Sequence, residues 1–126
     1  MKKFILTNLI FLSSIIFYSC ESNDDTIINN TPVATVPQLL SPGNNSTIST
    51  LEPTFDWVDF ANANSYNLQV SLNSAFSTLI IDTAGLVNSN FNSAAGIIND
   101  SNSYYWRVRA ITNDTTQWSN SYSFST

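Results

Sequence analysis

Three carboxylates lie close to a tryptophan between residues 52 and 59. Glu52, Asp56 and Asp59 flank Trp57, and a pair of carboxylates beside an aromatic ring is what a glycoside hydrolase uses as acid and nucleophile. Alternation along a strand, however, would separate these side chains onto opposite faces. A sandwich as small as this chain allows would also lack a cleft for a sugar ring, so we do not expect an active site here.

The residue types exclude further classes of chemistry. The chain has no histidine, both lysines precede residue 4, and the single cysteine is Cys20. Serine triads, cysteine–histidine dyads, Schiff-base chemistry and zinc sites each lack a required residue. Asp82, Asp100 and Asp114 could supply oxygen ligands to calcium, but no run of alternating Asp and Asn with a fixed glycine accompanies them. We therefore expect a protein that is not an enzyme and has no metal or cofactor.

Two segments place polar side chains where they could bind a partner. If both segments are strands, one outer face presents a polar set with one aromatic ring and two guanidinium groups. Such a surface could dock a protein or stack on a glycan. Equally, the arginines could pair with carboxylates and keep the sheet soluble. This candidate binding face consists of Asn67, Gln69, Tyr105, Arg107 and Arg109.

The strands that would position this face are the clearest elements of the sequence. Residues 103–110 alternate with a period of two, so Tyr104, Trp106, Val108 and Ala110 are expected to point into a core. Residues 66–72 alternate in the same way, with Tyr66, Leu68, Val70 and Leu72 inward. Both segments are predicted to be central strands.

Further strands and turns are expected on either side. Residues 36–42 carry two prolines and fit only an edge strand, followed by a type II turn at Pro42-Gly43. Residues 53–58 alternate with Phe55 and Trp57 on one side. The run 79–81 is expected to end at a turn over residues 82–85.

The C-terminal half adds two more strands. Residues 87–91 are polar enough for an edge strand. In the last strand, Trp118, Tyr122 and Phe124 share one parity, so all three are expected in the core. The count of seven strands with regular spacing and no helical period predicts an all-β, seven-stranded antiparallel sandwich.

Four segments together resemble a bacterial fibronectin type III domain. Residues 53–57, 65–70, 104–110 and 118–126 match it in order and spacing. The resemblance implies an immunoglobulin-like sandwich over residues 35–126, with Tyr104 as the corner tyrosine whose hydroxyl bonds to backbone just upstream. The expected structural core comprises Phe55, Trp57, Tyr66, Leu68, Val70, Tyr104, Trp106, Val108 and Phe124.

The N-terminus resembles a bacterial lipoprotein signal peptide. Residues 1–19 combine a basic start with an apolar run that is shorter than the ~20 residues needed to span a bilayer. A small residue, Ser19, precedes Cys20, whose thiol would carry diacylglycerol after cleavage. The alternative is a general secretory signal that leaves Cys20 free. Residues 20–34 are expected to form a flexible acidic linker that reaches about 20 Å.

These features predict an exported lipoprotein. Acidic residues behind Cys20 resemble the export tag of surface-exposed lipoproteins, so we expect a protein anchored by acylated Cys20 in the bacterial outer membrane and exposed at the cell surface. Without the two lysines, two arginines face nine carboxylates, which disfavours nucleic-acid binding.

Three functions remain open on this sequence. The first is a non-enzymatic module for spacing or for interaction with an envelope protein. The second is a carbohydrate-binding surface lipoprotein that stacks a sugar on Tyr105 or Trp118. The third is a truncated stalk of a larger surface enzyme.

Overall fold

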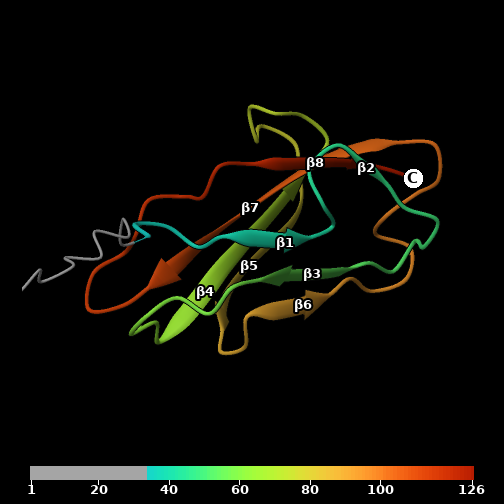
Figure 1. The fold of residues 1–126 in the computed structure, drawn as a ribbon. Helices are drawn as coiled ribbons and strands as arrows, with labels where there is room; N and C mark the ends of the chain where they lie inside the picture. Colours follow the sequence, from blue (N-terminus) through green and yellow to red (C-terminus); the bar gives the residue numbers. More distant parts are fainter. Residues whose placement is uncertain (1–33) are drawn as a thin grey trace, which may run out of the picture. The chain divides into compact units, whose positions relative to one another are not determined.

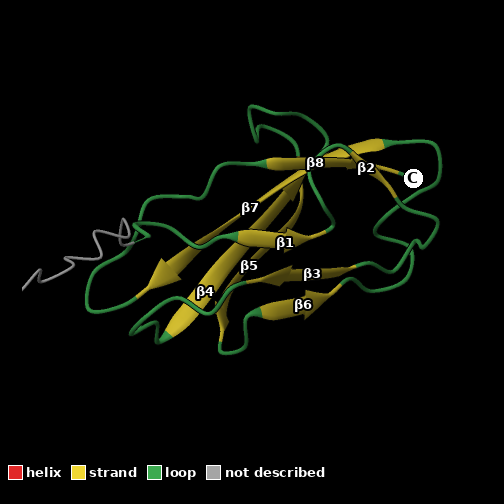
Figure 2. Cartoon of the chain, in the orientation of Figure 1, coloured by secondary structure: helices red, strands yellow, loops and turns green. Residues whose placement is uncertain are grey.

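The computed structural model describes residues 34–126, which form eight β-strands and no helix (Figures 1 and 2). The expected signal peptide and nearly all of the expected linker lie outside the described residues. In chain order the strands are β1 (Leu39–Ser41), β2 (Ser46–Thr47), β3 (Thr54–Trp57), β4 (Ser65–Ser71), β5 (Leu79–Leu86), β6 (Asn90–Asn92), β7 (Ser103–Ile111) and β8 (Tyr122–Ser125).

The strands form two sheets that pack face to face. The three-stranded sheet has the order β1-β3-β6 and the five-stranded sheet has the order β2-β8-β7-β4-β5. Figure 1 shows β1, β3 and β6 as one layer across the long strands β4, β5 and β7. The expected all-β architecture of two sheets is confirmed.

The expected count of seven antiparallel strands is wrong. The structure has eight strands, and β2 pairs parallel with β8. This strand contains only Ser46 and Thr47, so it is too short and too polar to show an alternating pattern in the sequence. It follows a turn in which Ser46 N–H donates to the Gly43 carbonyl at 3.1 Å.

That turn also differs from the expected one. Asn45, not Gly43, has the positive φ, of 58°. Asparagine tolerates the left-handed region because its short side chain can bond locally. Here its Oδ1 accepts a bond from the Ser123 hydroxyl at 2.8 Å.

The core lies between the sheets and depends on the pairing of β4 with β7. Their register sets Tyr66 opposite Ala110, Leu68 opposite Val108, and Val70 opposite Trp106. Aromatic pairs cross the core, as between Phe55 and Trp106 at 5.2 Å between ring centroids. All nine expected core residues are buried: Phe55, Trp57, Tyr66, Leu68, Val70, Tyr104, Trp106, Val108 and Phe124.

Two expectations about strand ends are wrong. Leu72 is 45% exposed, because the ladder with β5 is irregular after Val70 and Ser71 is buried instead. The expected turn over residues 82–85 is part of strand β5. The chain passes this point with a bulge, in which Ala84 and Gly85 together lie opposite Asn67, and Gly85 has the positive φ of 73° that such a bulge favours.

Tyr104 links the start of β7 to the loop before it. Its hydroxyl accepts a hydrogen bond from Asn99 N–H at 2.8 Å and donates one to the Asn99 carbonyl at 3.1 Å. Ile98, one residue earlier, is only 1% exposed. Two backbone groups of the loop are thus satisfied by one buried side chain.

We expect Tyr104→Phe to destabilise the domain by about 1–3 kcal/mol, because the Asn99 N–H loses its partner, while the Asn99 carbonyl keeps the bond from the Thr126 hydroxyl at 2.8 Å. Tyr105→Phe is the matched control, since the Tyr105 hydroxyl makes no hydrogen bond within residues 34–126, and it should change stability by less than about 0.5 kcal/mol. Urea unfolding followed by tryptophan fluorescence measures both. Equal losses for the two variants would contradict the role of the Tyr104 hydroxyl.

Candidate functional site

The candidate binding face lies on the outer side of the five-stranded sheet, away from the three-stranded sheet. The antiparallel register of β4 and β7 sets Gln69 opposite Arg107 and Asn67 opposite Arg109. Two aromatic residues from outside these strands complete the surface. We call the resulting set the arginine face: Asn67, Gln69, Phe76, Tyr105, Arg107, Arg109 and Trp118.

Arg107 is held by a hydrogen-bond ladder across three strands. Its Nε and Nη2 donate to Gln69 Oε1 at 3.0 and 2.8 Å. The other end of the same amide, Gln69 Nε2, donates to Asp82 Oδ1 at 3.2 Å. A neutral amide therefore separates the guanidinium from the nearest carboxylate in this ladder.

Arg109 is held in the same way by Asn67. With the amide oriented by its hydrogen-bond partners, its oxygen accepts from Arg109 Nη2 at 3.1 Å and Nε at 3.2 Å, and its nitrogen donates to the Tyr66 carbonyl at 3.2 Å. Both arginines thus use the same Nε and Nη2 side toward the facing strand.

Trp118 lies on this face and not in the core, so its expected inward orientation is wrong. The guanidinium carbons of Arg107 and Arg109 each lie 4.6 Å from its ring centroid. Strand alternation does not extend back to Trp118, because β8 begins only at Tyr122. Ser119 is the buried neighbour instead: its N–H donates to the Val108 carbonyl at 2.8 Å, and its hydroxyl accepts from Val108 N–H at 3.1 Å.

Phe76 is a member of the face that sequence reasoning missed. Its ring centroid lies 4.0 Å from the Arg107 guanidinium carbon. Its backbone has a φ of 55°, which is rare for a bulky residue and costs about 1–3 kcal/mol. The loop between β4 and β5 holds this conformation through Asn73, whose side-chain oxygen accepts bonds from Ser77 N–H and hydroxyl, each at 3.1 Å. The one available signal was an aromatic residue in a short polar loop.

The electrostatics of the face follow from this packing. Burial, and then the neighbouring charge of Arg109, lower the pKa of Arg107 below its ordinary value. Neither arginine forms an ion pair with a carboxylate within residues 34–126. The face therefore carries two close positive charges that amide oxygens orient and that no carboxylate of residues 34–126 neutralises.

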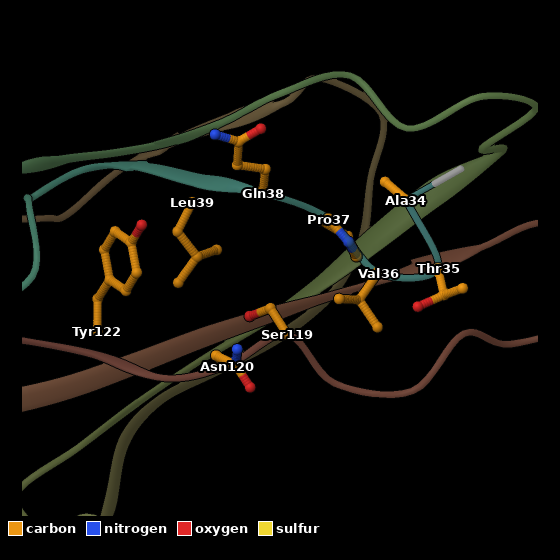
Figure 3. A pocket seen from close by; sticks show the side chains of 9 residues that line it. All are labelled: Ala34, Thr35, Val36, Pro37, Gln38, Leu39, Ser119, Asn120 and Tyr122. Atoms are coloured by element: carbon orange, nitrogen blue, oxygen red, sulfur yellow. The ribbon is translucent and has the colours of Figure 1, made fainter. Parts of the chain in front are cut away.

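Three hollows lie near the strand ends. One, of about 420 Å³, lies between the segment that enters β1 and the segment before β8 (Figure 3). Val36, Leu39, Ser119 and Tyr122 are among its lining residues, none of which is charged. A smaller hollow of about 220 Å³ adjoins Tyr105 and is lined largely by serine hydroxyls. A third hollow, of about 450 Å³, lies between the loops that follow β3 and β7 and has one carboxylate in its lining. None of these three hollows pairs a nucleophile with a base.

The acidic residues are not gathered into a site in the part of the chain that the structure describes. No group of three metal-ligating side chains occurs between residues 34 and 126. Asp82 bonds to Gln69, and Asp100 Oδ1 accepts from Ser101 N–H at 2.9 Å. Over the same range no helix is long and apolar enough to cross a membrane.

Comparisons with known proteins show the fold. No protein-family model matches the chain, and no curated protein does. Among solved structures, an Fn3-like protein from Clostridium thermocellum is similar with a TM-score of 0.55 and 19% identity, over 71% of this chain and 90% of that one. The fold of the domain is thus fibronectin type III-like.

A second solved structure is a much larger protein. The α-L-rhamnosidase from Dictyoglumus thermophilum is similar with a TM-score of 0.58 and 19% identity, over 72% of this chain. The match spans only 12% of the rhamnosidase. The same type of sandwich therefore also occurs as one part of a glycoside hydrolase.

Proposed function

We propose that this chain is a lipid-anchored, non-enzymatic fibronectin type III-like module that binds a protein of the cell envelope through its arginine face. The observation that carries the proposal is the fixed geometry of Arg107 and Arg109. Hydrogen bonds to amide oxygens orient their guanidinium groups, and aromatic rings pack against these groups. Long side chains that are already ordered lose little entropy on binding, so their contacts contribute more to affinity.

Interaction is favoured over spacing by what the arginine face contains. A spacer needs a soluble surface, and freely mobile charged side chains serve that purpose. Here, two arginines are packed against Trp118 and Phe76, and Phe76 adopts a costly backbone conformation to do so. Strained residues concentrate at binding and active sites, and arginine and tryptophan are enriched among the residues that dominate protein interfaces.

Carbohydrate binding is the second candidate, and the hollow beside Tyr105 favours it. That ring has no aromatic or cationic partner within residues 34–126, so one face could stack on a sugar. Trp118 is less suitable, because its indole already contacts two guanidinium groups at 4.6 Å. The occurrence of a similar fold within a rhamnosidase is compatible with a module of a glycan-processing surface protein.

We infer that the domain is not an enzyme from the residue types that it contains. The domain has no histidine or lysine in residues 34–126, and none of the three hollows brings together an acid and a base. An accessory module of an envelope complex requires none of these groups.

Anchoring through Cys20 and exposure at the surface of the outer membrane are part of the proposal. We expect wild-type protein to sediment with membranes and to incorporate radiolabelled palmitate, and Cys20→Ser to lose the label. Thr26→Ala is the matched control, since it removes a hydroxyl outside the signal peptide and leaves both Ser19 and the thiol in place, and it should keep the label. Unlabelled wild-type protein would instead favour the general secretory signal.

We expect a stoichiometric partner to accompany the tagged protein when membranes are solubilised in mild detergent. Arg107→Ala/Arg109→Ala should reduce its recovery by at least about tenfold, since truncation of central interface arginines costs about 2 kcal/mol or more. Glu52→Gln/Asp59→Asn removes as many charges away from the face and should leave recovery unchanged. Equal recovery with both variants would contradict binding through the arginine face.

A further inference from the structure

Arg107 and Arg109 present free hydrogen-bond donors at a defined spacing. They are two residues apart in β7, so their side chains leave the sheet on the same side about 7 Å apart. Each uses Nε and Nη2 toward the facing amide. Neither Nη1 has a hydrogen-bond partner within residues 34–126. An arginine bound along its Nε side can still donate two parallel N–H bonds from its Nη1 and Nη2 end to one carboxylate.

These two side chains are the only basic ones in residues 34–126, where six carboxylates stand against them. Their mutual repulsion is not relieved by any ion pair in this range, and it contributes to the lowered pKa of Arg107. An anion seated across both guanidinium groups would remove that repulsion. Charge complementarity therefore calls for a ligand with two negative groups about 7 Å apart.

We propose that the arginine face binds an extended acidic segment of its protein partner, with carboxylates on alternate residues and one carboxylate seated on each guanidinium group. The inference rests on the proposed function and names the chemistry of the partner. Alternate side chains of an extended chain lie about 7 Å apart on one side, which matches the spacing of the two arginines. The carboxylates of the extended segment would thus repeat every two residues, as the arginines of β7 do.

Other anions match this spacing less well. A single phosphate offers one charged centre for both guanidinium groups, whereas alternate residues of an extended segment offer one carboxylate to each. The acidic segment of this chain itself has carboxylates at Glu21, Asp24 and Asp25, and no two of them are two residues apart. That segment would therefore seat one carboxylate on the two arginines at a time.

The test uses the full chain, purified from membranes in a non-ionic detergent, and two fluorescent peptides of identical composition. One peptide carries two aspartates separated by a serine, and the other carries them side by side. Fluorescence anisotropy at low ionic strength measures both affinities. We expect the alternating peptide to bind about tenfold more tightly, the gain from a second charge-assisted pair.

Variants separate spacing from charge. Arg107→Gln or Arg109→Gln alone should reduce the two peptides to equal, weak affinity, and the double variant should abolish both. Glu52→Gln, in the loop before β3, should preserve the tenfold preference. Urea midpoints of the variants establish that each remains folded.

Several results would overturn the inference. Equal binding of both peptides by the native protein would reduce the face to a non-specific positive patch. Binding to vesicles of anionic lipid with no binding to either peptide would assign the face to lipid. Capture of a partner through Arg107 and Arg109 without peptide binding would refute the acidic segment and leave the proposed function standing. Peptide binding without any captured partner would instead refute the proposed function and leave recognition of the acidic segment standing.

Discussion

The in-register pairing of β4 with β7 determines both faces of the five-stranded sheet. On the inner side, the pairing sets Leu68 beside Val108 and Val70 beside Trp106, and so builds the centre of the core. On the outer side, the same ladder sets Gln69 beside Arg107 and Asn67 beside Arg109. A slip by one residue would bury the guanidinium groups and expose the aromatic rings. The core thus fixes the register, and the register fixes the arginine face.

The arginine face differs from an ordinary soluble sheet surface in how its charges are held. Exposed arginines usually pair with carboxylates and gain little stability from it. Here, amide oxygens take that place, and Trp118 and Phe76 pack against the guanidinium groups. Amides orient the arginines without neutralising them, so the positive charge remains available to a ligand. Among these features, the backbone conformation of Phe76 has a local cost in stability.

The sequence was sufficient to predict the structure wherever that structure depends on the alternation within a single strand. Period-two alternation located β4, β7 and five members of the arginine face, because side chains on a strand alternate regardless of context. It could not locate Phe76 or orient Trp118, since both depend on irregular backbone next to the sheet. A bulge at Gly85 similarly continued β5 through residues that resemble a turn. The two-residue β2 exists only because β8 is available for pairing.

Nuclear magnetic resonance of the Nε–H groups of Arg107 and Arg109 measures whether the two guanidinium groups are held in place. The full chain contains only two arginines, so Arg107→Lys assigns both signals. The structure predicts two separate Nε–H signals that exchange slowly with water, and shifts that change when Trp118 is replaced by leucine. A single merged signal at the position of free arginine, unaffected by Trp118→Leu, would contradict it.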